Sequence, residues 1–124
     1  ATSFMLGGRY VNVLSVDLTT AYPLDHRHLG DGPVVVYEAN STATPTLITP
    51  DQPLKLSPSD KYSFESWSVS PVAANGWALL GEQSKWVPVS PARFVSLDVD
   101  DKTMTVQLNG VEGETTGIAF RAPD

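Results

Sequence analysis

The sequence predicts an all-β fold, a single antiparallel β-sandwich or jelly roll of about 8–10 short strands. No segment of ten or more residues has a helical period, and ten prolines and nine glycines divide the 124 residues into pieces of strand length. No linker or internal repeat interrupts this pattern. Residues 1–124 are therefore expected to form one β-sandwich domain.

The first half of the chain contains four strand candidates. Residues 9–18 (RYVNVLSVDL) alternate, with Tyr10, Leu14, Val16 and Leu18 on one face. Residues 34–37 (VVVY) are a continuous apolar run, which is typical of a strand covered on both faces. Residues 46–49 and 54–56 are shorter candidates, and each is closed by a proline.

Residues 62–94 hold all three tryptophans, Trp67, Trp77 and Trp86, separated by turn residues. Large aromatics without helical spacing indicate short strands joined by tight loops. Trp77 directly follows the turn pair Asn75-Gly76, so we expect it to begin a strand and to be partly exposed. Trp67 has strand residues on both sides, and we expect it to lie in the core.

The clearest element is a hairpin at residues 95–108. Two segments of alternating apolar and polar residues flank a polar turn at Asp101-Lys102, which predicts two paired strands with one wet face and one buried face. Ile118 and Phe120 are expected to add a last strand to the same core. Six hairpin residues are predicted to face that core: Val95, Leu97, Val99, Met104, Val106 and Leu108.

Composition excludes several classes of partner. The net charge is −6, from 8 basic and 14 acidic residues, and the basic residues are scattered instead of clustered. Nucleic acid and anionic membrane surfaces are therefore not expected as partners. No apolar run of membrane-spanning length exists, and without cysteine neither disulfides nor thiolate metal sites can form.

Two features favour a secreted, extracellular protein. The chain begins Ala1-Thr2-Ser3 without an initiator methionine, as expected after removal of a signal peptide or after trimming. Asn40 begins the sequon Asn-Ser-Thr in a loop-like setting, so Asn40 is a candidate glycosylation site.

Two groups of residues are candidate metal ligands. His26 and His28 could face one side of an extended segment, but a third ligand would have to come from Asp25 or Asp31, and a polar surface loop is the simpler interpretation. The acidic residues at the hairpin turn, Asp98, Asp100 and Asp101, lack the calcium-loop pattern and are interpreted as a solvated strand face. No metal and no cofactor is predicted.

Catalysis is not predicted either. The chain has no nucleophile elbow, phosphate loop or zinc-protease motif. Glycoside hydrolysis needs two carboxyl groups across a cleft, and spacing alone cannot pair any of the glutamates. We therefore predict that the protein is not an enzyme.

Carbohydrate is the ligand class that the tryptophans favour. Sugar rings stack on exposed aromatic faces, and their hydroxyls bind nearby amides and carboxylates. Trp77 and Trp86 are the candidate platform, and Asn75, Glu82 and Gln83 are the candidate polar partners. The alternative is that the tryptophans fill the core of a small sandwich.

The same part of the chain resembles a known family. The segments YSFESWSVSPV, NGWALLGE and KWVPVS, followed by the hairpin and the upstream VVVYE, resemble the C-terminal β-sandwich of family 36 glycoside hydrolases and raffinose-synthase-like proteins. The resemblance covers residues 33–123. It implies a non-catalytic sandwich from a carbohydrate-active lineage, because the family's catalytic aspartates belong to a barrel outside this region.

Two functions follow as hypotheses. The first is a secreted, non-catalytic accessory or binding module that associates with carbohydrate. The second is a structural subunit of an extracellular filament, coat or sheath that self-associates through sheet edges. In the second, residues 1–8 (ATSFMLGG) would serve as a flexible or exchanged N-terminal arm.

Overall fold

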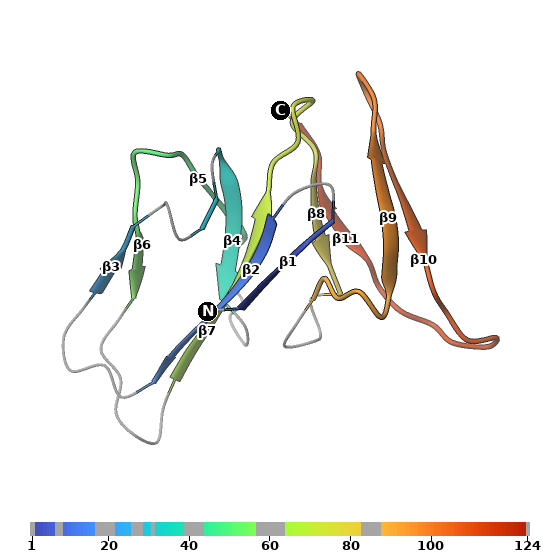
Figure 1. The fold of residues 1–124 in the computed structure, drawn as a ribbon, viewed down its shortest axis with the longest axis horizontal. Coiled ribbons are helices and arrows are strands. Elements are labelled where there is room, and N and C mark those ends of the chain that lie inside the picture. The colour runs from blue at the N-terminus through green and yellow to red at the C-terminus, as the bar shows by residue number, and fades with distance from the viewer. Residues whose placement is uncertain are drawn as a thin grey trace.

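The computed structural model describes residues 2–6, 9–16, 22–25, 29–30, 32–38, 44–56, 64–82 and 88–123. These residues form eleven β-strands and no helix (Figure 1), which confirms the all-β prediction. The strands are β1 (Thr2–Met5), β2 (Arg9–Val16), β3 (Tyr22–Leu24), β4 (Val34–Glu38), β5 (Thr46–Ile48), β6 (Leu54–Leu56), β7 (Phe64–Pro71), β8 (Ala78–Gly81), β9 (Phe94–Val99), β10 (Met104–Leu108) and β11 (Ala119–Arg121).

The strands pair into one large sheet and three small ones. The large sheet has the order β1-β2-β7-β4-β5, and the two-stranded sheets are β3–β6, β8–β11 and β9–β10. Every pair in them is antiparallel. The predicted antiparallel class is therefore confirmed, whereas this arrangement does not confirm the finer prediction of a sandwich or jelly roll.

The five-stranded sheet is covered on both faces. Side chains at alternate positions of a strand point to opposite faces. On one face a valine cluster of β2, β4 and β7 packs against Leu54 and Leu56 of β6. On the other face Val35 packs against Ala78 and Leu80 of β8. Figure 1 shows the β3–β6 pair and the β8–β11 pair on opposite sides of this sheet.

Coverage on both faces explains the continuous apolar run at residues 34–37. All four residues from Val34 to Tyr37 are buried, as predicted for a strand covered on both faces. The same holds for β8, where Ala78 and Leu80 face the large sheet and Leu79 joins the cluster under β9–β10. A strand that contacts two layers has no wet face, so its sequence does not alternate.

The β9–β10 pair, called here the ribbon, packs on the molecule through its middle. Leu97, Met104 and Val106 lie against the cluster around Leu79 and Phe94. The prediction that all six apolar hairpin residues face one core is wrong for three of them: Val95, Val99 and Leu108 are 46%, 43% and 41% exposed. A register shift at Gln107/Leu108 places Leu108 opposite Phe94, so the simple alternation ends there.

The two faces of strand β2 are unequally covered. Tyr10 is buried, but Leu14 on the same face is 62% exposed, while Val11 and Val13 of the opposite face are buried. The cause is tertiary. The valine face is covered by the layer that contains β6, whereas the layer on the other face covers Tyr10 and leaves Leu14 uncovered.

The N-terminal strand β1 pairs with β2 of its own chain, with Thr2 opposite Asn12 and Met5 opposite Arg9. It forms an edge of the five-stranded sheet. Exchange of residues 1–8 between copies stays a prediction, because an edge strand that pairs within one chain can pair in the same register with a neighbour.

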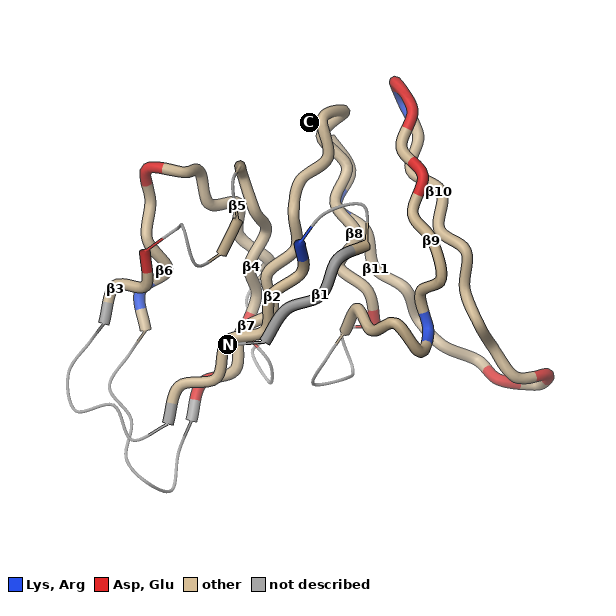
Figure 2. Tube along the Cα trace, in the orientation of Figure 1, with Lys and Arg blue, Asp and Glu red and all other residues tan. Residues whose placement is uncertain are grey.

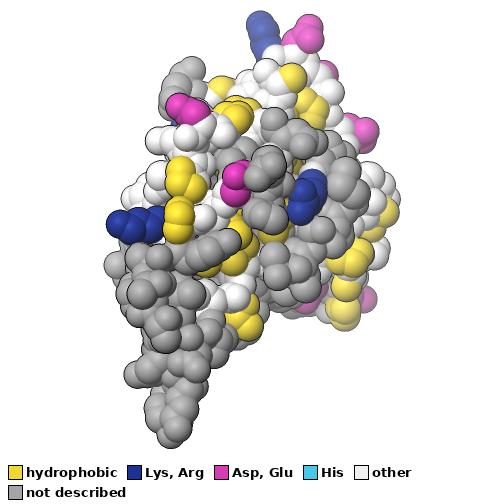
Figure 3. All heavy atoms as spheres, turned by 60° about the vertical axis from the view of Figure 1, so that its left-hand side comes forward, with side chains coloured by type: hydrophobic (Ala, Val, Ile, Leu, Met, Phe, Trp, Pro, Cys, Tyr) yellow, Lys and Arg dark blue, Asp and Glu magenta, His cyan; other side chains and the backbone are white. Residues whose placement is uncertain are grey.

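Charge is unevenly distributed along the described chain. Acidic residues gather at the tip of the ribbon and in the loop after β10, whereas β6 and the start of β2 carry basic residues (Figure 2). On the face shown in Figure 3, hydrophobic side chains are scattered among polar ones. No helix among the described residues is long and apolar enough to cross a membrane.

Candidate functional site

The predicted turn at Asn75-Gly76 is present and tightly hydrogen-bonded. The Ala73 N–H donates to the Trp77 carbonyl at 2.8 Å, and the Gly76 N–H donates to the Ala73 carbonyl at 2.9 Å. Gly76 has a φ of 90°, which a glycine adopts without steric cost. The Asn75 Oδ1 accepts the Trp77 N–H at 3.1 Å. The turn therefore holds Asn75 and Trp77, which are two of the five residues that the sequence places at the candidate sugar site.

Both of these side chains hold the tip of the ribbon. The Asn75 Nδ2 donates to the carbonyls of Asp100 and Thr103, at 2.8 and 3.1 Å. The Trp77 Nε1 donates to the Lys102 carbonyl at 2.9 Å. An asparagine amide has two donor hydrogens and a tryptophan has one, so these bonds use every side-chain donor of the pair. The side-chain N–H groups of Asn75 and Trp77 therefore bind within the protein and not to a ligand at the surface.

The Trp77 ring is partly buried and forms an aromatic pair with Phe120. The ring centroids are 6.4 Å apart and the planes meet at 85°, an edge-to-face geometry. Phe120 is 38% exposed. Trp67 is likewise partly buried: it packs against the valine cluster and donates its Nε1 to Glu65 at 3.2 Å. The expected contrast between a core Trp67 and an exposed Trp77 is therefore small in the structure.

Asp100 closes the ribbon tip from within. Its Oδ1 accepts the backbone N–H groups of Lys102 at 2.9 Å and Thr103 at 2.7 Å. Hydrogen bonds from the Thr103 side chain and from these two amides hold the pKa of Asp100 below its ordinary value. The Asp100 carboxylate therefore stabilises the turn at the ribbon tip.

Glu82, a predicted sugar-binding residue, lies inside the molecule. It is 1% exposed, its Oε1 lies 3.2 Å from the Arg93 Nε, and its Oε2 accepts the Thr116 hydroxyl at 2.5 Å. The residue before it, Gly81, has a φ of 82° and lies so close to the Pro88 backbone that no side chain would fit. A glycine is therefore needed at the point where the chain turns inward. In this position the Glu82 carboxylate serves the protein's own ion-pair network and does not face the surface.

Arg93 is the centre of that network. It makes a two-pronged ion pair with Glu114, with Nη1–Oε1 and Nη2–Oε2 distances of 2.5 and 2.6 Å, and its Nη1 also donates to the Asn109 carbonyl at 2.7 Å. The hydrogen bond to Glu114 is the main cause of a raised Arg93 pKa. The network joins the end of β8, the base of the ribbon and the loop after β10.

Only a weak signal of this network is present in the sequence. Arg93 is the only basic residue between Lys85 and Lys102, and three glutamates lie within about twenty residues of it, so charge balance alone could have suggested a pairing. Which glutamates it meets depends on the fold. A depression of about 240 Å³ beside it is lined by Ala92, Asn109 and Val111, among others.

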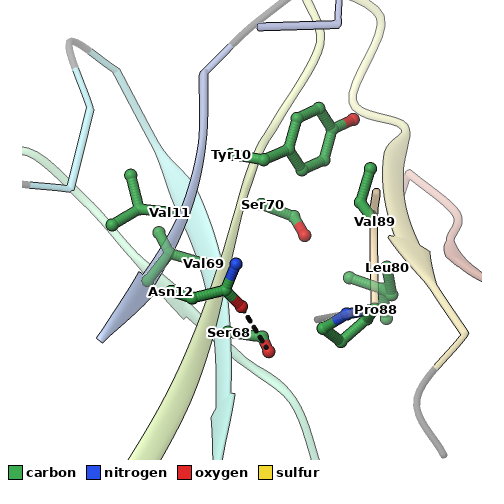
Figure 4. A pocket seen from close by; sticks show the side chains of 9 residues that line it. All are labelled: Tyr10, Val11, Asn12, Ser68, Val69, Ser70, Leu80, Pro88 and Val89. Atoms are coloured by element: carbon green, nitrogen blue, oxygen red, sulfur yellow. Dashed lines mark hydrogen bonds between the residues drawn. The ribbon is translucent and has the colours of Figure 1, made fainter. Parts of the chain in front are cut away.

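A second polar group lies between the five-stranded sheet and β8 (Figure 4). Tyr10, Asn12, Ser68 and Ser70 project from β2 and β7 toward Leu80, and the Ser68 hydroxyl donates to the Asn12 Oδ1 at 3.5 Å. Burial raises the pKa of Tyr10. The cavity among them is about 10 Å³, which suits one water molecule and no sugar.

The remaining predicted site residues lie outside the described part of the chain. They are the second platform residue Trp86, its partner Gln83 and the sequon residue Asn40. The carbohydrate and glycosylation roles of these three positions stay predictions. The histidines His26 and His28, interpreted as part of a surface loop, also lie outside the described residues. Among the residues that the structure does describe, no group of three or more histidine, cysteine or acidic side chains could hold a metal ion.

Comparisons with known proteins give no match: no family model, no curated protein and no solved structure matches the chain. The resemblance to the C-terminal domain of family 36 glycoside hydrolases therefore has no support from these comparisons and stays a prediction.

Proposed function

We propose that the protein is a non-catalytic structural subunit that self-associates through its β9–β10 ribbon. The observation that carries this proposal is that the ribbon pairs with no third strand among the described residues. It also exposes three apolar side chains, Val95, Val99 and Leu108. Of the two functions that the sequence predicts, this one makes use of a surface that the fold leaves open.

The outer edges of β9 and β10 pair with no other strand among the described residues. An unpaired edge presents a row of backbone N–H and C=O groups, which is a template for another strand. Burying a whole valine or leucine side chain stabilises by about 1.5–3 kcal/mol, so each half-exposed ribbon residue can contribute about 1 kcal/mol to an interface. Backbone pairing and apolar burial would therefore act on the same surface.

Charge favours unlike contact surfaces. The ribbon carries Asp98, Asp100 and Asp101 near its tip, with Lys102 as the only basic residue there (Figure 2). Two ribbons placed tip to tip would bring these carboxylates together, which is unfavourable. Contact between the ribbon and a different surface of the next copy avoids this repulsion. Such head-to-tail contacts generate rings or filaments, as a coat or sheath requires.

The assembly test compares native mass spectra of the wild type and two variants over a range of concentrations. Val99→Glu adds a charge to the ribbon, and Leu14→Glu adds the same charge to an exposed apolar position on β2. We expect the wild type and Leu14→Glu to form oligomers and Val99→Glu to remain monomeric. A monomeric wild type at every concentration would refute the proposal, and so would equal assembly of the two variants.

Carbohydrate association is the second candidate, and one observation favours it. Phe120 is exposed beside Trp77, so an aromatic surface exists at the site that the sequence selects. The polar groups of Asn75, Trp77 and Glu82 weigh against it, because each already binds within the protein. A glycan array with the wild type and Phe120→Ala tests this candidate: binding that the substitution removes supports it, and an array without signal refutes it. Both candidate functions assume a secreted protein. Expression in a glycosylating eukaryotic host tests this assumption, because glycosylation should then add the mass of one glycan at Asn40.

A further inference from the structure

The chain contains two Asn-Gly pairs, Asn75-Gly76 and Asn109-Gly110. In such a pair the deprotonated glycine nitrogen can attack the asparagine side-chain carbonyl carbon. A bond forms between the glycine nitrogen and that carbon, the bond between the carbon and the side-chain nitrogen breaks, and ammonia is released. The product is a five-membered succinimide ring. Water then opens the ring to aspartate or isoaspartate. Glycine favours the reaction because it has no side chain to block the approach and its backbone rotates freely.

The two pairs differ in the hydrogen bonds that their reacting peptide groups make. At Gly76 the N–H donates to the Ala73 carbonyl at 2.9 Å, and this bond is lost when the nitrogen loses its proton. At Asn109-Gly110 the carbonyl of the reacting peptide accepts a hydrogen bond from the Arg93 Nη1 at 2.7 Å. The negative charge of a deprotonated peptide is shared with its carbonyl oxygen. A guanidinium at that oxygen stabilises the reactive form.

The attacked side chain differs as well. The Asn75 side chain makes three hydrogen bonds, two from its Nδ2 to the ribbon tip and one from the Trp77 N–H to its Oδ1. These bonds prevent the Asn75 amide from rotating toward the Gly76 nitrogen. Asn109 and Gly110 are both exposed at the end of the ribbon. The Asn109 side chain is therefore accessible to water, whereas three hydrogen bonds hold the Asn75 side chain.

We propose that Asn109 is a site of spontaneous succinimide formation and conversion to isoaspartate in the folded protein, and that the fold protects Asn75. The consequence falls on the Arg93 network. The Asn109 N–H donates to the Arg93 carbonyl at 2.8 Å, so Asn109 and Arg93 bind each other twice. Isoaspartate inserts an extra carbon into the main chain at this point and adds a negative charge close to Glu114. Conversion thus loosens the base of the ribbon.

Peptide mass spectrometry tests the proposal. The folded protein is incubated at mildly alkaline pH and cleaved after lysine and arginine, which places Asn75 in peptide 62–85 and Asn109 in peptide 103–121. Peptide 103–121 is expected to gain one mass unit and to separate into aspartate and isoaspartate forms. Conversion at Asn75 is expected to be at least about tenfold slower, because several hydrogen bonds must open first. Equal rates at the two sites in the folded protein would overturn the proposal.

Two further arms separate the fold from the local sequence. In denaturant, both pairs should react at similar rates, and Asn109 should be no faster than it is in the folded protein. A folded-state rate at Asn109 that lies tenfold below the denatured-state rate would overturn the role of Arg93. Gly110→Ala should slow conversion without disturbing the fold, since an added Cβ would lie 3.5 Å from the Arg93 Nη1 and 3.6 Å from the Glu114 Oε1. Unchanged conversion in this variant would refute attack by that nitrogen.

Discussion

Gly81→Ala is the substitution for which the structure makes the sharpest stability prediction. Gly81 has a φ of 82°, and an alanine Cβ there would lie 2.3 Å from the Pro88 carbonyl oxygen and 2.7 Å from a methyl of Val89. The left-handed backbone costs about 1–2 kcal/mol for a residue with a Cβ. Overpacking costs about a further 1–3 kcal/mol. We therefore expect a loss of about 2–5 kcal/mol in the free energy of unfolding.

Gly113→Ala is the matched control. Gly113 has nearly the same φ, 85°, but no atom lies within 4 Å of the position that its Cβ would take. Only the backbone term remains, so we expect a loss of about 1–2 kcal/mol. Urea unfolding measures both variants, and equal slopes of free energy against urea concentration show that the shift in midpoint reports stability.

The difference between the two losses of unfolding free energy tests whether the Pro88 segment packs on the end of β8. A typical domain is stable by only about 5–15 kcal/mol, so Gly81→Ala should remove a large part of the total. Equal losses in the two variants would refute the close approach of the Pro88 backbone to Gly81. The inward course of the chain that buries Glu82 would then need another explanation.

Three further predictions test the ribbon and its attachment. Trp77→Phe keeps an aromatic ring but removes the donor to the Lys102 carbonyl, so it should cost about 0.5–1.5 kcal/mol in urea unfolding, and an unchanged midpoint would contradict that bond. The pKa of Asp100 is lowered in the folded state, so its stabilising effect should be complete above the unfolded value of about 3.9 and should be lost as pH falls through the lower folded value. The protection of the Lys102 and Thr103 amides, measured as the exchange rate relative to the intrinsic rate at the same pH, should therefore fall in acid. Asp100→Asn should abolish this dependence and Asp101→Asn should keep it; identical profiles for the two variants would contradict the assignment. Leu97→Ala should cost about 2 kcal/mol, the lower end for a core leucine, because this side chain is only partly buried, and a loss near 5 kcal/mol would mean that the ribbon is covered.

The local pattern of the sequence identified many of the strands and turns, but it placed no strand at β1 or at β3. Alternation identified the ribbon, the continuous run at residues 34–37 identified a strand covered on both faces, and Asn75-Gly76 identified a turn followed by a strand. These features depend on neighbours within a few residues, and backbone geometry converts such patterns directly into strand or turn.

Only the tertiary structure decided which polar groups meet. Asn75 binds carbonyls 25 and 28 residues away, and Glu82 binds Arg93 and Thr116, 11 and 34 residues away. A glutamate in a loop and a glutamate buried in an ion pair have the same local sequence signal, so the pattern predicted a surface role for Glu82 that its position does not favour. The exposed residues of the ribbon follow the same rule. Alternation states which side chains share a face, but the extent of the layer beneath decides how many of them are covered, because burial depends on contacts between segments distant in the chain.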